Sequence, residues 1–212
     1  MNLANQYWFF KSVIPHRICD EIIKYGSLQQ EQVALTGKQG NLDSKNLCEK
    51  DIKELHKKRK SNVVWMDDRW IYKEIQPYIN IANKSAGWNF DWDWSESCQF
   101  TKYDGSKKQH YDWHCDSNEL PYDQPNDPNT HGKIRKLSAT VSLVDSSEYE
   151  GGDFEFDFRN NDDGSNIARV CEEIKTKGSV VVFPSFVWHR VKPVTAGTRY
   201  SLVIWNLGWP FR

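Results

Sequence analysis

The sequence predicts a mainly β fold whose helices are confined to the N-terminal part. From Trp88 onward, short runs alternate between apolar and polar residues and are separated by turn residues. Ten Trp, nine Tyr and ten Phe also favour strands, because aromatic side chains pack well on a pleated surface. Helical spacing of apolar residues is visible only before Trp88. We therefore expect a double-stranded β-helix (jelly roll) core supported by N-terminal helices.

A short strand and a helix are the first elements expected. Residues 7–13 are mostly aromatic and apolar, which is typical of a strand. Pro15 is suited to the start of a helix, and Gly26 is suited to its end. Residues 27–62 are polar and contain a basic run, Lys53 to Lys60, which we interpret as a solvated loop. The alternative is a loop that borders a substrate groove.

A second helix is expected after a short strand over Val63–Met66. Asp67 or Asp68 can cap this helix, and apolar residues at helical spacing follow as far as Ala82. Pro77 lies inside the pattern and should kink or divide the helix, because proline has no N–H to donate.

Strands dominate the remainder of the chain. The alternating runs that predict them are 90–94, 98–103, 111–114, 137–144, 154–158, 167–175, 180–183, 187–191 and 200–207. Polar turns are expected at 150–153 and 160–165. Residues 117–135 are rich in Pro, Asn and Asp, and loops of that length in compact domains are usually functional or disordered. We interpret this segment as a substrate lid.

Composition limits the possible functions and locations. A formal net charge of −1 gives no general attraction to nucleic acid or to an anionic membrane. Five Cys without a C-x-x-C pair favour free thiols in a reducing compartment. No signal peptide and no membrane-spanning apolar stretch are recognised, so we expect a cytoplasmic protein. We expect one catalytic domain over residues 1–212, in which residues 1–95 form helices and strands that support a β-helix core at residues 96–212. The sequence leaves the oligomeric state open.

Two candidate metal ligands lie two residues apart in His114-Cys115-Asp116. Side chains alternate along a strand, so His114 and Asp116 should share a face. With a second histidine they would form the 2-His-1-carboxylate set that suits Fe(II) with open positions, and His189 is the downstream candidate. The triplet from His110 to Asp112 has the same form and is the competing choice. We prefer His114 and Asp116, which lie nearer the long loop.

The pattern resembles a known family. The residues that carry the resemblance are Tyr103, Gly105, Tyr111, Trp113, His114, Asp116, Gly151, Gly152, His189, Arg199 and Trp205. They are similar to those of Fe(II)/2-oxoglutarate dioxygenases, nearest the prolyl 4-hydroxylase-like branch. The resemblance covers the chain from about Trp65 to Trp209.

The resemblance implies a set of cofactors and a role for each site residue. His114, Asp116 and His189 would bind Fe(II), and Arg199, Ser201 and Tyr103 would hold 2-oxoglutarate. O2 would be consumed with release of succinate and CO2, and ascorbate would be an optional reductant. Ser142 stands where many relatives have a cosubstrate-binding Tyr, and Lys192 is a weaker alternative to Arg199 as the anchor.

Three functions remain open from the sequence. The preferred one is hydroxylation of prolyl or other residues in a protein or peptide. The alternatives are a 2-oxoglutarate oxygenase of a free amino acid or other small molecule, and a β-barrel used only for binding. Trp205 occupies the position of a second Arg in the nucleic-acid demethylases, which argues against nucleic acid as the substrate. The intact triad and Arg199 argue against the binding protein.

Overall fold

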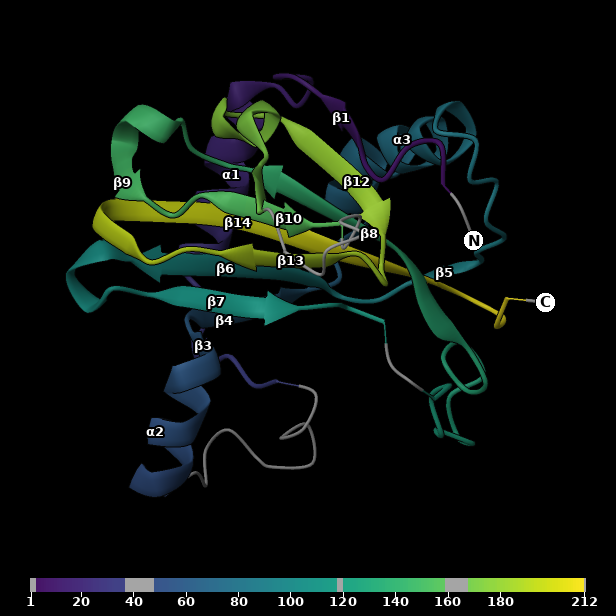
Figure 1. Cartoon of the computed structure of the whole chain (residues 1–212), viewed down its shortest axis with the longest axis horizontal. Helices are drawn as coiled ribbons and strands as arrows, with labels where there is room; N and C mark the ends of the chain where they lie inside the picture. Colours follow the sequence, from purple (N-terminus) through teal and green to yellow (C-terminus); the bar gives the residue numbers. More distant parts are fainter. Residues whose placement is uncertain (1–2, 37–47, 118–119, 159–167, 212) are drawn as a thin grey trace, which may run out of the picture.

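Two antiparallel sheets form the framework of the protein (Figure 1). The computed structural model describes residues 3–36, 48–117, 120–158 and 168–211. The large sheet has the order β1-β12-β8-β14-β6-β4-β2, with β5 and β9 also paired to β14. The small sheet has the order β11-β10-β13-β7-β3. This arrangement, together with helices that precede Trp88, confirms the predicted mainly β fold.

The strand bounds are as follows. The large sheet contains β1 (Trp8–Phe10), β2 (Gln32–Val33), β4 (Asn62–Met66), β5 (Trp94–Ser95), β6 (Cys98–Asp104), β8 (Ile134–Ser142), β9 (Tyr149–Gly151), β12 (Val180–Pro184) and β14 (Val194–Gly208). The small sheet contains β3 (Arg59–Lys60), β7 (His110–His114), β10 (Phe154–Asp157), β11 (Arg169–Val170) and β13 (Trp188–Val191). The helices described are α1 (His16–Ser27), α2 (Glu49–Lys58) and α3 (Arg69–Ser85), with 3-10 turns η2 (Gly105–Lys107), η3 (Ser146–Glu148) and η4 (Glu172–Lys175).

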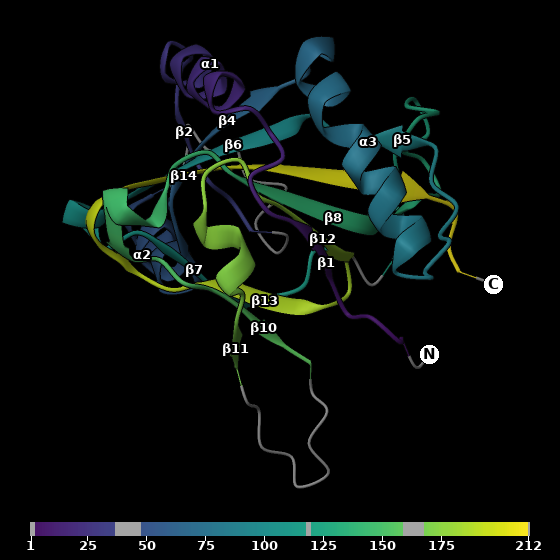
Figure 2. The same cartoon turned by 90° about the horizontal axis from the view of Figure 1, so that it is seen from above.

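Two apolar cores lie on the two faces of the large sheet. Helices α1 and α3 cover its outer face (Figure 2), where Ile22 and Ile75 pack with Leu202 of β14 in one buried cluster. The inner face meets the small sheet, where Phe156 and Phe183 lie in a second cluster. Strand β14 contributes to both faces because its side chains alternate. Its inner face therefore points to the space between the sheets.

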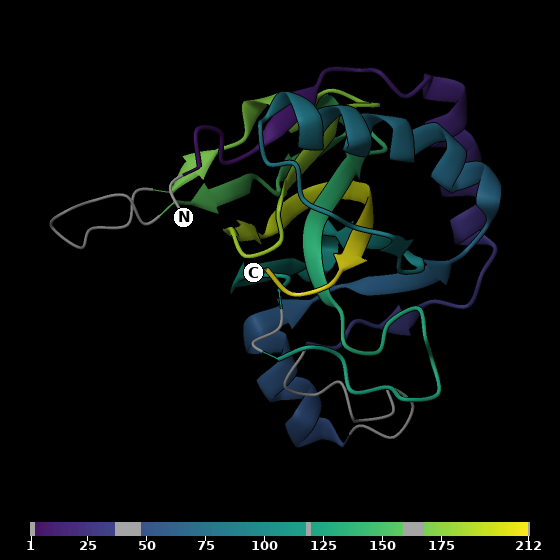
Figure 3. The same cartoon turned by 90° about the vertical axis from the view of Figure 1, so that its right-hand side faces the viewer.

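The region predicted as a solvated loop contains a helix, so that interpretation was wrong for residues 49–58. Helix α2 extends below β7 and β3 (Figures 1 and 3). Cys48 and Asp51 form its capping box, and Leu55 is its buried residue. One buried side chain among many charged ones gives a weak helical signal, which is why composition suggested a loop.

Gly26 and Pro77 do not interrupt their helices as predicted. Gly26 lies inside α1, and a Cβ placed on it would come within 2.6 Å of Met66 Cε. The absence of a side chain is thus needed for close packing rather than for ending the helix. Helix α3 continues through the exposed Pro77, since Ile75 and Ile79 on the buried face anchor it on both sides.

The strands predicted at 7–13, 90–94 and 167–175 are shorter than expected, and only Trp8–Phe10 of the first forms β1. Residues 90–94 are irregular until β5 begins at Trp94, and the described part of the last run, residues 168–175, forms only β11 before η4. The Asn83 side chain forms hydrogen bonds with both the N–H and the carbonyl of Phe90. These backbone groups are therefore satisfied without pairing to another strand. The turn predicted at 160–165 lies outside the described residues. All five cysteines are free thiols, as their spacing predicted.

Candidate metal centre and cosubstrate cavity

A β-bulge in β7 determines which H-x-D triplet faces the interior. Tyr111 pairs with Val191 and His114 pairs with His189, so two residues of β7 lie opposite one residue of β13. A bulge of this kind reverses the side-chain alternation beyond it. Tyr111 and His114 therefore share the inner face although they are three positions apart, and both line the same cavity.

The competing triplet faces away from this cavity. His110 and Asp112 flank Tyr111 on the regular part of β7, so their side chains point to the opposite face. The ring of His110 contacts the Lys108 carbonyl at 3.2 Å instead. On a regular strand the side chains of both triplets would point to the same face. The bulge places the two triplets on opposite faces.

Three side chains converge at the inner end of β7. The donor atoms of His114, Asp116 and His189 all lie within 4.8 Å of one another. His114 Nε2 is 3.7 Å from Asp116 Oδ1, and His189 Nε2 is 3.6 Å from Asp116 Oδ2. Asp116 follows the end of β7, where its backbone N–H donates to the Ser185 carbonyl. In the described part of the chain this is the cluster whose ligand types match the 2-His-1-carboxylate set.

Hydrogen bonds orient each ligand candidate. Nδ1 of His114 lies 2.8 Å from the Asp112 carbonyl, and Nδ1 of His189 lies 2.9 Å from the Val187 carbonyl. A carbonyl only accepts, so both imidazoles carry their proton on Nδ1 and present Nε2 as a lone-pair donor. Ser138 Oγ donates to Asp116 Oδ2 at 2.7 Å.

The protonation states also suit a divalent cation. Burial lowers the pKa of His114 well below its usual 6.5, and the adjacent His189 adds to this effect. Burial alone would raise the pKa of Asp116, but His189, His114 and Arg135 together bring it below its usual 3.8. Near neutral pH the cluster therefore holds neutral imidazole and an ionised carboxylate, the forms that bind metals.

A narrow cavity of about 40 Å³ extends from this cluster toward β14. Its lining includes every residue predicted for metal or cosubstrate: Tyr103, His114, Asp116, His189, Arg199 and Ser201. Arg199, Ser201, Val203 and Trp205 face it from the inner side of β14, as the alternation along that strand predicted. Lys192 does not line it and is 45% exposed beside Asp153 and Glu155.

Arg199 is buried at the far end of this cavity without a counterion. Its side chain is 2% exposed, and its contact with Ser201 Oγ is long, at 3.4 Å. No carboxylate of the described residues lies within 4.0 Å of the guanidinium. A buried cation without a partner is costly, so an anionic ligand fits here. The Nε1 donor of buried Trp205 likewise has no acceptor among the described residues.

The sequence assigned no role at the site to four neighbours of the cluster. Ser138 supports Asp116, as described above, and Tyr111 stacks on His114. Arg59 is buried and its guanidinium lies 4.4 Å from the centre of the Tyr111 ring. Arg135 lies 3.8 Å from the centre of the Trp205 ring. Arg59 belongs to the basic run assigned to solvent, and no pattern in the sequence separates it from its exposed neighbours.

A jelly-roll framework that encloses a largely buried His-Asp-His cluster beside an unpaired arginine defines a non-haem iron oxygenase type of site. The profile described as the 2OG-Fe(II) oxygenase superfamily matches residues 98–206, just over half of the chain. The chain belongs to this superfamily. The predicted family resemblance is thus confirmed, and with it the cofactors Fe(II), 2-oxoglutarate and O2.

Curated relatives match this region at moderate identity. A PKHD-type hydroxylase of Pseudoalteromonas atlantica is 31% identical over 109 residues, which cover 50% of this chain and 41% of the relative. A PKHD-type hydroxylase of Synechococcus sp. is 34% identical over 96 residues, which cover 45% of this chain and 35% of the relative. The matched region thus spans about two fifths of the length of these curated relatives.

Solved structures share the fold over nearly the whole chain. A Pseudomonas putida prolyl-4-hydroxylase superposes with a TM-score of 0.66 at 16% identity, covering 96% of this chain and 93% of that one. A viral collagen prolyl hydroxylase from Paramecium Bursaria Chlorella virus-1, in a 2OG complex, gives a TM-score of 0.62 at 18% identity and covers 97% of both chains. These similarities confirm the jelly-roll core. Across the described ranges, no helix has both the length and the apolar character needed to cross a membrane.

Proposed function

We propose that the protein is an Fe(II)- and 2-oxoglutarate-dependent dioxygenase that hydroxylates a prolyl residue in a polypeptide. The observation that carries this proposal is one cavity that joins a buried His-Asp-His cluster to a buried arginine without a counterion. The first feature suits Fe(II) and the second suits the distal carboxylate of a 2-oxo acid. The same reaction would yield succinate and CO2.

Each residue of the cavity has a defined task in this proposal. His114, Asp116 and His189 would hold Fe(II), which supplies the oxidation chemistry when bound. Arg199 would pair with the distal carboxylate of 2-oxoglutarate, assisted by Ser201 and Tyr103. The phenol of Tyr103 lies under the guanidinium, with Arg199 Cζ 5.5 Å from its ring centre. Ser142 Oγ donates to the Val144 carbonyl and does not line the cavity, so it would not replace the Tyr of relatives.

A polypeptide is the favoured substrate class. One similar structure is a Trichoplax adhaerens prolyl hydroxylase in complex with a hypoxia inducible factor peptide fragment, with a TM-score of 0.67, 16% identity, and coverage of 96% of this chain and 84% of that one. The curated relatives are named hydroxylases of the PKHD type. In the competing proposal the substrate is a free amino acid or other small molecule, which would bind in the cavity alone. Nothing in the described residues supports a barrel that only binds.

The organisation proposed for the chain is one catalytic domain. Residues 96–212 would supply all the ligands, and residues 1–95 would buttress the large sheet through α1 and α3. The free cysteines support the proposed reducing, cytoplasmic location.

Mass spectrometry of proline-rich peptides tests the reaction directly. The protein is incubated with such peptides, Fe(II), 2-oxoglutarate and ascorbate, and each product is searched for one added oxygen on proline. Hydroxyproline that requires both Fe(II) and 2-oxoglutarate is the expected result. Succinate formation only in the presence of a free amino acid, with every peptide unchanged, would favour the small-molecule alternative.

A further inference from the structure

A single tight turn, residues 184–187 between β12 and β13, contacts two of the three candidate metal ligands. The carbonyl of Ser185 in this turn accepts the backbone N–H of Asp116 at 2.8 Å. The carbonyl of Val187 accepts the Nδ1–H of His189 at 2.9 Å. The position of this turn therefore affects both ligands at once.

A chain of two hydroxyl groups extends from the same turn to the carboxylate of Asp116. Ser138 Oγ donates to Asp116 Oδ2 at 2.7 Å. A hydroxyl has one proton to donate, so the contact of 2.9 Å between Ser138 Oγ and Ser185 Oγ has Ser185 as its donor. Ser185 is fully buried, and its N–H donates to the Lys136 carbonyl of β8 at 2.9 Å. A shift of Ser185 would therefore change its contacts with both the backbone and the side chain of Asp116.

Three phenylalanine rings fix the turn through Phe186, the residue that follows Ser185. The centre of the Phe186 ring lies 6.4 Å from that of Phe90 and 6.1 Å from that of Phe211. Phe90 and Phe211 meet edge to face, with ring centres 4.8 Å apart. These separations lie within the range in which aromatic pairs attract one another. We call Phe90, Phe186 and Phe211 the phenylalanine clamp.

The phenylalanine clamp is anchored to regular elements of the fold. Phe90 is 7% exposed, and its N–H and carbonyl both bond to the side chain of Asn83 in α3. Lys136 of β8 places Nζ 4.7 Å from the centre of the Phe211 ring. Phe186 and Phe211 are 37% and 39% exposed. Their rings can therefore be removed without opening a cavity in the core.

We propose that Phe186 is a positioning residue for the metal site and acts through Ser185. The phenylalanine clamp holds the 184–187 turn where Asp116 and His189 are already arranged for a divalent cation. Without the clamp the turn has more conformations, and a metal ion must order it on binding, which costs affinity. Groups that orient metal ligands typically change metal affinity by about 10- to 100-fold. The inference rests on the metal site that the proposed function also requires.

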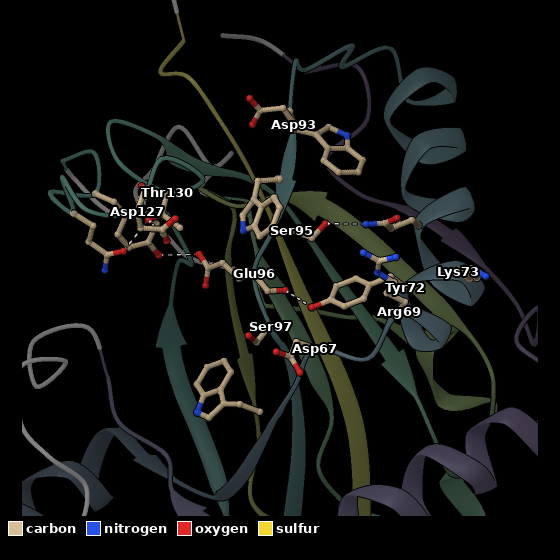
Figure 4. A pocket seen from close by; sticks show the side chains of 16 residues that line it. Asp67, Arg69, Tyr72, Lys73, Asp93, Ser95, Glu96, Ser97, Asp127 and Thr130 are labelled. Carbon is tan, nitrogen blue, oxygen red and sulfur yellow. Dashed lines mark hydrogen bonds between the residues drawn. The ribbon is translucent and has the colours of Figure 1, made fainter.

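Calorimetric titration of the metal-free protein with Mn(II) tests the clamp. Phe186→Ala should weaken binding at least roughly tenfold, whereas Phe186→Tyr keeps the ring and should bind nearly as well as the unaltered protein. Phe211→Ala should weaken binding by a smaller factor, and it carries the test if Phe186→Ala does not fold. Trp94→Ala is the matched control and should leave the affinity unchanged. This 41% exposed ring lines a separate groove between α3 and residues 122–130, to which the turn does not contribute (Figure 4).

Hydrogen exchange of backbone amides identifies the route of the effect. The amides of Asp116 and Ser117 both donate to the Ser185 carbonyl. They should exchange at least roughly tenfold faster in Phe186→Ala, because local loosening of the turn exposes them. The amides of β14 should keep their rates, since only a general loss of stability would accelerate them as well. Phe186→Tyr should restore slow exchange.

The results separate failure of the clamp from failure of the proposed reaction. Unchanged Mn(II) affinity in Phe186→Ala and Phe211→Ala, or an equal loss in Trp94→Ala, would overturn the inference. Equal acceleration of the Asp116 and β14 amides would overturn it too. Hydroxylation of proline-rich peptides by Fe(II)-loaded samples is recorded in parallel. Clamp-dependent Mn(II) binding without hydroxyproline would support the clamp and count against prolyl hydroxylation. Hydroxyproline formation with Mn(II) affinity independent of the clamp would reject the clamp alone.

Discussion

The phenol ring of Tyr111 stacks on the imidazole of His114, with ring centres 3.5 Å apart and an interplanar angle of 12°. Two residues separated by three positions would lie on opposite faces of a regular strand, so this contact exists because of the bulge in β7. Tyr111 also contacts the guanidinium of buried Arg59. The position of the His114 ring thus depends on a residue from the N-terminal part of the chain.

Removing the Tyr111 ring should weaken metal binding. Tyr111→Leu removes the stacked surface, and loss of a group that orients a metal ligand typically costs about 10- to 100-fold in affinity. Tyr111→Phe keeps the ring and should bind metal nearly as well as the unaltered protein. Calorimetric titration with Mn(II) measures both. Equal losses in the two variants would show that the hydroxyl matters and the stacking does not.

Arg59 should act on the metal site through Tyr111. Arg59→Met removes the charge and the planar group that contacts the ring, while it keeps most of the length of the side chain. We expect weaker Mn(II) binding, by less than in Tyr111→Leu. Lys57→Met is the matched control, because Lys57 is an exposed residue of the same basic run, paired with Glu54. Identical metal affinity for Arg59→Met and Lys57→Met would refute this role.

The two carboxylates of the HYDWHCD stretch should behave differently. Asp116→Ala removes the only carboxylate of the His-Asp-His cluster in the described residues and should abolish metal binding and turnover. Asp112 contributes its carbonyl to His114, and Asp112→Ala keeps that carbonyl, so much of the activity should remain. Measurements of metal content after dialysis and of succinate production distinguish the two variants. The reverse order would mean that the other triplet binds the metal.

Ser138 should support the ionised form of Asp116. Its hydroxyl donates at 2.7 Å to the carboxylate oxygen that faces His189. Hydrogen bonds to charged groups are worth about 1.5–3 kcal/mol, so Ser138→Ala should weaken metal binding by roughly 10- to 150-fold. Ser142→Ala is the control, since that hydroxyl bonds a carbonyl away from the cavity. Unchanged Mn(II) affinity in Ser138→Ala would contradict the expectation.

Arg199 should determine the affinity for 2-oxoglutarate, and its removal should leave the affinity for the metal nearly unchanged. Removing one partner of a buried charge pair costs about 3–5 kcal/mol, or roughly a hundred- to several-thousand-fold in affinity. Arg199→Lys should be intermediate, because it keeps the charge and loses the bidentate fork. Ser201→Ala should cost about 1 kcal/mol. Titration of the Mn(II)-loaded variants with 2-oxoglutarate gives these affinities. Normal binding by Arg199→Ala with a loss in Lys192→Ala would transfer the anchor to Lys192.

The sequence was sufficient for the fold class, which depends on local patterns, and for naming the residues of the candidate site, which came from spacing and from the family resemblance together. Alternation along β14 placed Arg199 and Ser201 on one face, and the order of His114, Asp116 and His189 indicated the cluster. The choice between the two triplets could not be derived from alternation, since the bulge arises from pairing with a strand far away in the chain. Arg59 and Ser138 were missed for the same reason: their contacts are made by folding, and their neighbours in sequence resemble them.

The central claim is that the His-Asp-His cluster and Arg199 together support oxidation coupled to 2-oxoglutarate. The most direct measurement is the ratio of succinate to hydroxyproline formed from a proline-rich peptide by Fe(II)-loaded protein in air. We predict comparable amounts of both products, each lost on omission of Fe(II) and in Asp116→Ala. Folded, Fe(II)-loaded protein that produced neither product, or that produced both equally well as Asp116→Ala, would contradict the account.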